Sequence, residues 1–177
     1  MRPRFAPPVL NLRELVTAAD LRRLSGDNPG WQFERSAEGK LRLSPTNSRN
    51  GLRNVELIAQ LVAWNRRVHF GKVFDSSSGF TMPDGAVLSP DGSCIRAERW
   101  NGLTAAQQDS YAPLCPDVCI EIASSSDRWP AVCTKIDDYA SYGATYALAL
   151  DPATRQRYER GAPPGGLTLD LDAIFDA

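Results

Sequence analysis

The sequence predicts a mixed α/β or α+β fold, with a single domain over residues 17–177 that follows an irregular arm at residues 1–16. The 177 residues suit one domain, because domains usually hold about 100–200 residues. Helical and strand patterns follow one another in the order helix, two strands, helix, several strands, helix and two strands. A hydrophobic content of 42% and a charged content of 23% are ordinary for a globular protein and exclude wholesale disorder.

Composition also limits the function. No apolar run approaches the roughly 20 residues of a membrane-spanning helix. The single histidine, His69, excludes zinc sites built from several histidines, and the four cysteines form no CxxC pair. The N-terminal segment is too short and too interrupted by proline for a secretory signal, so we expect a cytoplasmic protein with reduced thiols. A net charge of −1 provides no overall attraction to nucleic acid.

The first elements are predicted to be a short helix and a hairpin. Thr17 is a suitable N-cap for a helix at residues 18–25, and the run at 26–30, which is rich in glycine and contains proline, ends it. Residues 31–35 and 40–43 have the pattern of paired strands joined by a short turn.

A long helix is predicted over residues 51–70. Apolar side chains recur at helical spacing along one side of it, and we expect this stripe to face the core. The stripe consists of Leu52, Val55, Ile58, Ala59 and Val62. The opposite face carries Leu57 and Trp64 among polar residues. That face is a dimer contact, a nucleic-acid-facing patch or a surface covered by a second layer of the same domain.

The rest of the chain is predicted to be rich in strands. These occupy residues 72–75, 80–82, 86–95, 117–123, 146–150 and 155–160, the last two as antiparallel neighbours. A short helix is expected near residues 104–109. A longer helix is predicted over residues 127–142, with Asp127 as its N-cap and Pro130 in its first turn.

Three residues stand out as candidates for chemistry. Alternation along residues 117–123 places Glu121 in the middle of a strand that has at least one buried face. A glutamate buried there is costly unless it is paired or bound to a cation. Lys135 lies close to the apolar side of the following helix, where a snorkelling lysine is the alternative interpretation. Asp91 begins a strand and, taken alone, is an ordinary turn aspartate.

Together these residues indicate phosphodiester chemistry. The carboxylates of Asp91 and Glu121 are hard oxygen ligands that suit Mg²⁺ or Mn²⁺. A metal ion there would activate a water molecule and neutralise charge on a phosphoryl group, while Lys135 would orient and deprotonate the water. This combination is typical of metal-dependent phosphodiester hydrolysis.

An ordered series of short segments extends along the chain. The segments are FDSSSGF at 74–80, MPDG at 82–85, LSPD at 88–91, PDVCIEI at 116–122, SDR at 126–128, KIDDYA at 135–140 and LDP at 150–152. Further matches lie at residues 33–45 and 169–175. The series resembles the Uma family of the PD-(D/E)XK, restriction-endonuclease-like superfamily, over about nine tenths of the chain.

The resemblance implies a restriction-endonuclease-like core, in which helices flank a mixed central sheet, and a homodimer. It implies an endonuclease that acts on DNA with Mg²⁺ or Mn²⁺. Asp91 would be the central metal-binding aspartate, Glu121 the acid of the D/E-x-K pair and the backbone carbonyl of Ile122 a further ligand. The usual lysine two residues after that acid is absent, and Lys135 on the following helix matches its relocated place. Glu34 matches an acidic position that supports the site or a second metal ion.

The chain departs from the family pattern near the site without losing a metal ligand or the lysine. Asn50 stands where many relatives have histidine, and Gly92 replaces a β-branched residue after Asp91. If duplex DNA is the substrate, four arginines on or before the long helix are candidates for phosphate contacts or are simply solvated. They are Arg49, Arg53, Arg66 and Arg67.

Two other functions fit the same sequence, because a fold does not determine a function. The first is a non-catalytic protein-interaction module on a nuclease-like fold, with Leu57 and Trp64 at its interface. The second is a metal-dependent hydrolase of a smaller phosphoester, which would cleave a model phosphodiester and leave DNA intact.

Overall fold

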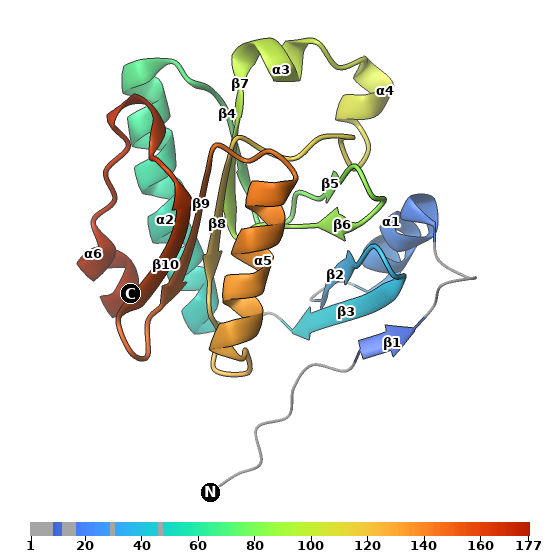
Figure 1. Ribbon diagram of the computed structural model, residues 1–177, viewed down its shortest axis with the longest axis horizontal. Helices are drawn as coiled ribbons and strands as arrows, with labels where there is room; N and C mark the ends of the chain where they lie inside the picture. Colours follow the sequence, from blue (N-terminus) through green and yellow to red (C-terminus); the bar gives the residue numbers. More distant parts are fainter. Residues whose placement is uncertain (1–8, 12–16, 29–30, 46–47) are drawn as a thin grey trace, which may run out of the picture.

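The computed structural model describes residues 9–11, 17–28, 31–45 and 48–177, and it contains two five-stranded sheets with helices around them (Figure 1). The larger part of the molecule is built on what we call the core sheet, which has the strand order β10-β9-β8-β7-β4. The other sheet, called the second sheet, has the order β1-β3-β2-β6-β5. This architecture confirms the predicted mixed α/β fold.

The core sheet is mixed, as the family resemblance implies. Its strands are β4 (Gly71–Asp75), β7 (Gly92–Arg96), β8 (Val118–Ile122), β9 (Tyr146–Asp151) and β10 (Gln156–Gly161). Strands β8 and β9 run parallel, and all other neighbours in this sheet are antiparallel. A parallel pair needs a long crossover, and helix α5 (Trp129–Ser141) provides it.

Helices cover both faces of the core sheet. Helix α2 (Ser48–Val68) packs on one face together with α6 (Leu171–Asp176), and α5 packs on the other. Alternation along β8 directs Val118 and Ile120 toward α2 and Cys119 toward α5, so Glu121 faces the α5 side. The short helices α3 (Ala97–Asn101) and α4 (Ala105–Gln108) lie between β7 and β8. Among the described helices, none is long and apolar enough to cross a membrane.

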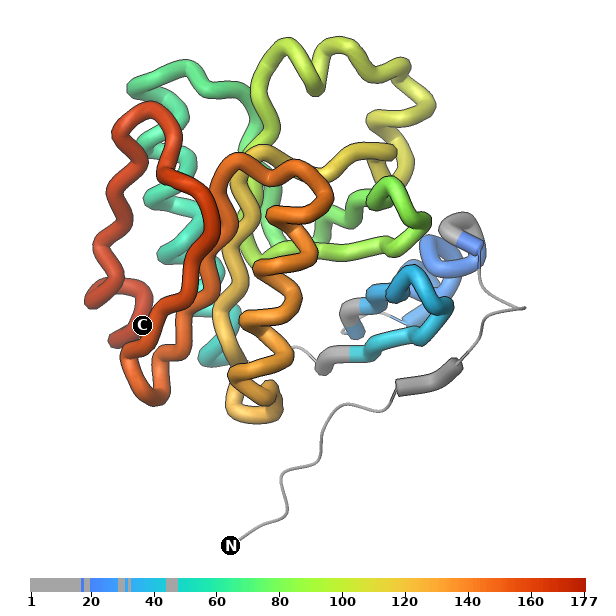
Figure 2. The backbone as a smooth tube through the Cα atoms, viewed as in Figure 1, coloured from blue at the N-terminus to red at the C-terminus, as the bar shows by residue number. Residues whose placement is uncertain are grey.

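The second sheet is antiparallel throughout. It contains β1 (Val9–Asn11), β2 (Trp31–Arg35), β3 (Lys40–Pro45), β5 (Phe80–Thr81) and β6 (Val87–Leu88). Helix α1 (Ala18–Asp27) begins with a capping box at Thr17 and buries Leu21 against the β2–β3 hairpin. Figure 2 shows this hairpin to one side of the core, next to the segment that carries β5 and β6.

The predicted orientation of α2 is wrong. Leu57 and Trp64 are buried against the core sheet, whereas Leu52 and Val55 are 61% and 70% exposed. Large apolar side chains gain the most from burial, which explains why this face turns inward. Gly92 on β7 allows the close approach, because a Cβ atom there would lie 2.8 Å from Leu57 Cδ2. A second layer of the same domain therefore covers the face that carries Trp64.

Three predicted element boundaries also need correction. The strand expected at residues 86–95 is interrupted at Pro90 and forms β6 and β7, which belong to different sheets, because proline has no N–H for a strand ladder. Helix α5 begins at Trp129 after Arg128, so Asp127 is not its N-cap. Within the arm at residues 1–16, Val9–Asn11 form a strand instead of an irregular segment, and the other residues of the arm lie outside the described ones. The single-domain boundary at residue 17 stays a prediction.

Candidate active site

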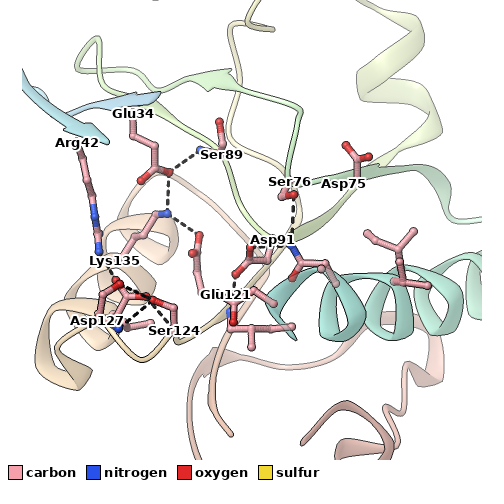
Figure 3. Close-up of a pocket in the computed structure, with 18 of the residues that line it drawn as sticks. Glu34, Arg42, Asp75, Ser76, Ser89, Asp91, Glu121, Ser124, Asp127 and Lys135 are labelled. Atoms are coloured by element: carbon pink, nitrogen blue, oxygen red, sulfur yellow. Dashed lines mark hydrogen bonds and ion pairs between the residues drawn. The ribbon is translucent and has the colours of Figure 1, made fainter. Parts of the chain in front are cut away.

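A pocket of about 590 Å³ lies where the two sheets meet α2 and α5 (Figure 3). Glu34 lines it from the second sheet, Asp91 and Glu121 from the core sheet and the loop before it, and Lys135 from α5. The N-terminal half of α2 and the loop after β8 complete the wall. The structure thus brings together the four side chains that the sequence nominated, although they come from four separate elements.

Lys135 is at the centre of the polar network in the pocket. Its Nζ atom lies 2.7 Å from Glu34 Oε1 and 2.8 Å from Glu121 Oε1. The three side chains are only 9–11% exposed, so both ion pairs are shielded from solvent. Tyr139, one helical turn after Lys135, donates a hydrogen bond to the same Glu121 oxygen at 2.8 Å. The predicted position of Lys135 on the core side of its helix is confirmed.

Asp91 is fixed at the end of β8 by two hydrogen bonds. Its Oδ2 atom accepts from the Ile122 backbone N–H at 2.7 Å, and its Oδ1 atom accepts from Asn54 Nδ2 at 3.2 Å. The antiparallel register pairs Gly92 with Ile120, so Asp91, one residue before the strand, comes next to Glu121 and Ile122 at the end of β8. Asn54 Oδ1 is buried and has no hydrogen-bond partner among the described residues. This oxygen acceptor thus lies on the same side chain that donates to Asp91.

Glu34 reaches the pocket from the hairpin of the second sheet. Its Oε1 atom, which faces Lys135, also accepts a hydrogen bond from the Ser89 backbone N–H at 2.8 Å. Ser89 belongs to the same short loop as Asp91, so this bond ties the hairpin to the loop. The expected place of Glu34 beside the site agrees with this geometry, and its role in catalysis stays a prediction.

Burial controls the charges in the pocket. It raises the pKa of Glu121 to about 8 against the opposing effect of Lys135, and Asp91 and Glu34 add to the rise. Burial also raises the pKa of Asp91. On Lys135 burial disfavours the charge, but Glu121 and Glu34 outweigh it and raise the pKa, so the ammonium group stays protonated. One cation thus faces three acidic groups.

Several residues that contact the site side chains were missed in the sequence. Tyr139 lies four positions after Lys135, and residues at this spacing are neighbours on one face of a helix. The sequence could therefore have predicted that Tyr139 lies beside Lys135. Arg42 lies directly opposite Glu34 in the hairpin, so the predicted strand pairing could have placed it at the site. No local pattern in the sequence predicts the ion pair between Arg42 Nη2 and Asp127 Oδ1, which are 2.7 Å apart.

The arginines proposed for phosphate contacts lie outside the pocket. Among the described pocket-lining residues, none is one of the four arginines nominated on or before α2. Arg53 Nη2 instead donates to the Phe175 carbonyl at 3.4 Å. Trp64, whose face motivated the proposed interface, is buried and donates to the Gly165 carbonyl at 3.1 Å. The homodimer therefore loses that support and stays a prediction.

The acidic side chains do not form a ready-made metal cage. In the part of the chain that the structure describes, no group of three or more His, Cys, Asp or Glu side chains is placed to hold a metal ion. Glu34 and Glu121 converge on Lys135 instead. Asp91, Glu121 and the Ile122 carbonyl remain the expected ligands, and their role is considered below as a proposal.

A mixed core sheet between helices and a pocket with acids and a lysine at its edge define a protein of the restriction-endonuclease-like class. The model of the Uma2 family, described as "Putative restriction endonuclease", matches residues 18–161, and the chain belongs to this family. The fold is similar to a crystal structure from Anabaena variabilis described as "a putative nuclease belonging to DUF820". That match has a TM-score of 0.65 and 14% identity, and it covers 91% of this chain and 98% of the other. No curated protein sequence matches the chain. The family and the fold support a nuclease function.

Proposed function

We propose that this protein is a metal-dependent endonuclease that hydrolyses phosphodiester bonds of DNA. The proposal is carried by the convergence of Asp91, Glu121 and Lys135 in one pocket, from the loop before β7, from β8 and from the helix that follows β8. Membership of the Uma2 family and the likeness to a nuclease structure support it. Oxygen ligands for a cation beside a lysine are the groups that phosphodiester hydrolysis requires.

The donor set of the pocket fits Mg²⁺ or Mn²⁺. Mg²⁺ is usually bound through one or two carboxylates and keeps several water molecules, so it needs no third acidic ligand. Asp91, Glu121 and the Ile122 carbonyl would hold the ion, and the buried Asn54 Oδ1, which is unpartnered among the described residues, is a further oxygen acceptor beside them. When bound, the ion would lower the pKa of a water molecule and offset charge on the phosphoryl group.

Lys135 would orient the attacking water. Glu121 and Glu34 raise its pKa, so Nζ is protonated in the metal-free protein and would act on the water as a hydrogen-bond donor and a positive charge. The deprotonation of the water by Lys135 stays a prediction from the sequence. The carboxylates of Glu34 and Glu121 engage two of its three N–H bonds, which leaves the third for the water or a phosphoryl oxygen. Glu34, itself held by the Ser89 N–H, assists by fixing Nζ in place.

The structure weakens one of the two alternative functions and leaves the other open. The non-catalytic interaction module loses the interface on which it depended, because Leu57 and Trp64 belong to the core. The hydrolase of a smaller phosphoester would use the same acids and the same lysine, so the substrate range of the protein must separate it from an endonuclease.

Cleavage of supercoiled plasmid DNA tests the proposal. Wild-type protein is expected to nick the plasmid with Mg²⁺ or Mn²⁺ and to stop in EDTA. Glu121→Gln and Lys135→Ala are expected to reduce the rate at least about 100-fold, because each removes a group that stabilises the transition state. Glu98→Gln and Lys72→Ala remove the same side-chain types at exposed positions on α3 and β4, and they should cleave like the wild type.

Thermal melting must accompany this assay, since loss of Lys135 leaves two buried glutamates without their cation. Equal cleavage by all five proteins would indicate a contaminating nuclease and contradict the assigned site. Absence of cleavage on supercoiled, linear and single-stranded DNA would contradict the DNA substrate. Hydrolysis of bis(p-nitrophenyl) phosphate in that case would favour the smaller phosphoester.

A further inference from the structure

Arg42 is the second cation of the pocket. Among the described residues that line it, Arg42 and Lys135 carry the positive charges. The acidic residues of the lining are Glu34, Asp75, Asp91, Glu121 and Asp127. Arg42 is paired directly with Glu34 across the β2–β3 hairpin, so both side chains leave the same face of the second sheet and extend into the pocket (Figure 3).

An ion pair holds Arg42 at the edge of the pocket. Its Nη2 atom lies 2.7 Å from Asp127 Oδ1, and Asp127 Oδ2 accepts hydrogen bonds from the Ser124 N–H at 2.9 Å and the Ser124 hydroxyl at 2.7 Å. The side chain of Arg42 is 30% exposed, compared with 11% for Lys135. A ligand that enters the pocket from solvent therefore reaches Arg42 more easily than Lys135, which two carboxylates enclose.

The ion pair between Arg42 and Asp127 is expected to contribute little to the stability of the fold, because partly exposed ion pairs are weak. Stability alone therefore does not explain why an arginine occupies this position. A DNA strand, however, brings one negative charge per linkage into a pocket that already holds five acidic side chains. The charge of Lys135 is shared by Glu34 and Glu121. Arg42 is thus the more exposed of the two cations, and its planar guanidinium matches the oxygens of a phosphate.

We infer that Arg42 contacts a backbone phosphate of the DNA strand in the pocket, and that Asp127 competes with this phosphate for the guanidinium. The inference rests on the proposed function and names a contact of the same substrate. In the free protein Asp127 keeps Arg42 in position. In the complex the phosphate accepts hydrogen bonds from some of the five N–H groups of the guanidinium in place of Asp127.

The two partners of this ion pair predict opposite effects on the cleavage of a DNA oligonucleotide. Arg42→Gln is expected to raise KM about tenfold and to leave kcat within about twofold, because it removes a charge-assisted contact made before and during the chemical step. Asp127→Asn keeps an acceptor for Ser124 but removes the competing charge, so it is expected to lower KM about threefold.

Salt dependence provides a readout that a purely structural ion pair would not change. The slope of log(kcat/KM) against log[KCl] should become shallower by about 0.7–0.9 in Arg42→Gln, as expected for the loss of one phosphate contact. Arg42→Lys keeps the charge and should keep the slope. Arg157→Gln is the matched control, because Arg157 is exposed on β10 and does not line this pocket.

The outcomes separate this inference from the proposed function. A wild-type protein that cleaves no DNA overturns the proposed function and the inference with it. A wild-type protein that cleaves DNA while Arg42→Gln keeps its KM and salt slope overturns the inference alone. A rise of KM in both Arg42→Gln and Asp127→Asn, with equal losses of melting temperature, also overturns it, because the pair would then only join the hairpin to the core.

Discussion

Glu34 and Glu121 share one lysine, and this arrangement links their charges. Each places its Oε1 atom within 2.8 Å of Lys135 Nζ, and neither side chain is open to bulk water. A buried charge is costly unless it is paired, and one ammonium group pairs imperfectly with two carboxylates. The carboxyl group of Glu121 therefore holds its proton to a higher pH than an exposed glutamate would.

We predict that the metal-free protein loses stability as the pH rises from 6 to 9. The pKa of Glu121 is raised from 4.5 to about 8, so in this range the folded state binds a proton that the unfolded state has released. Its contribution to stability is complete below about pH 4.5 and disappears as the pH rises through about 8. The melting temperature in EDTA should therefore fall, and it should fall less in Glu121→Gln. An equal fall in both proteins would assign the effect to other groups.

Added Mg²⁺ is expected to stabilise the protein more at pH 9 than at pH 6. A divalent cation favours ionised carboxylates, and protons compete with it for Asp91 and Glu121 at the lower pH. Melting curves with and without 10 mM MgCl₂ at each pH measure the difference, and Asp91→Asn should reduce it. A shift of the same size in this variant would place the binding of Mg²⁺ elsewhere.

The sequence identified some site residues and missed others for physical reasons. Glu121 was recognisable because strand alternation buries it, and Lys135 because of its side of a helix. Asp91 alone is an ordinary turn aspartate and became a candidate only together with Glu121 and Lys135, whereas Glu34 was nominated through the family resemblance. Arg42 meets its partner across the boundary between the two sheets, and such a contact leaves no local pattern in either segment.

At the level of elements, α2 shows that an apolar stripe alone does not orient a helix. Both of its faces carry apolar side chains, so periodicity allowed either face to turn inward. The structure buries the face with Leu57 and Trp64, where the apolar surface is larger, and exposes Leu52 and Val55. Comparing the surface areas of the two faces would have given the correct orientation.

Substitutions on the two faces of α2 should therefore differ in cost. Leu57→Ala is expected to lower the free energy of unfolding by about 2–5 kcal/mol, because it leaves a cavity in the core. Val55→Ala, at an exposed position, is expected to change it by less than about 0.5 kcal/mol. Guanidinium chloride denaturation measures both values. A larger loss of unfolding free energy for Val55→Ala than for Leu57→Ala would indicate that the face with Val55 is the buried one, as the sequence pattern predicted.

At the level of the whole molecule, the sequence predicted most strands but not their division into two sheets. The alternation of Val118, Ile120 and Ile122 was sufficient to predict β8. The assignment of β6 to the second sheet depends instead on a pairing between Arg35 and Val87, far apart in the chain. Local patterns specify that a segment is extended, whereas its neighbours are decided by contacts over long sequence distances.

The burial of thiols offers a measure of how the whole molecule unfolds. Cys94, Cys115 and Cys119 are buried, Cys133 is partly exposed, and burial raises the pKa of Cys94 to about 12. We expect one thiol of the native protein to react readily with Ellman's reagent and the other three to react only after unfolding. Cys133→Ser should remove the early reaction. Early modification of more than one thiol would indicate local opening of the core.

The candidate site combines a hairpin near the start of the chain with a helix about one hundred positions later, between Glu34 and Lys135. On the ribosome the hairpin emerges first, and the pocket lacks its lysine until α5 has been synthesised and has docked. A nascent or damaged chain would thus expose acidic groups without the cation that organises them. For the proposed nuclease such an assembly order would be a safeguard, because only a completely folded molecule would cleave the DNA of the cell that makes it.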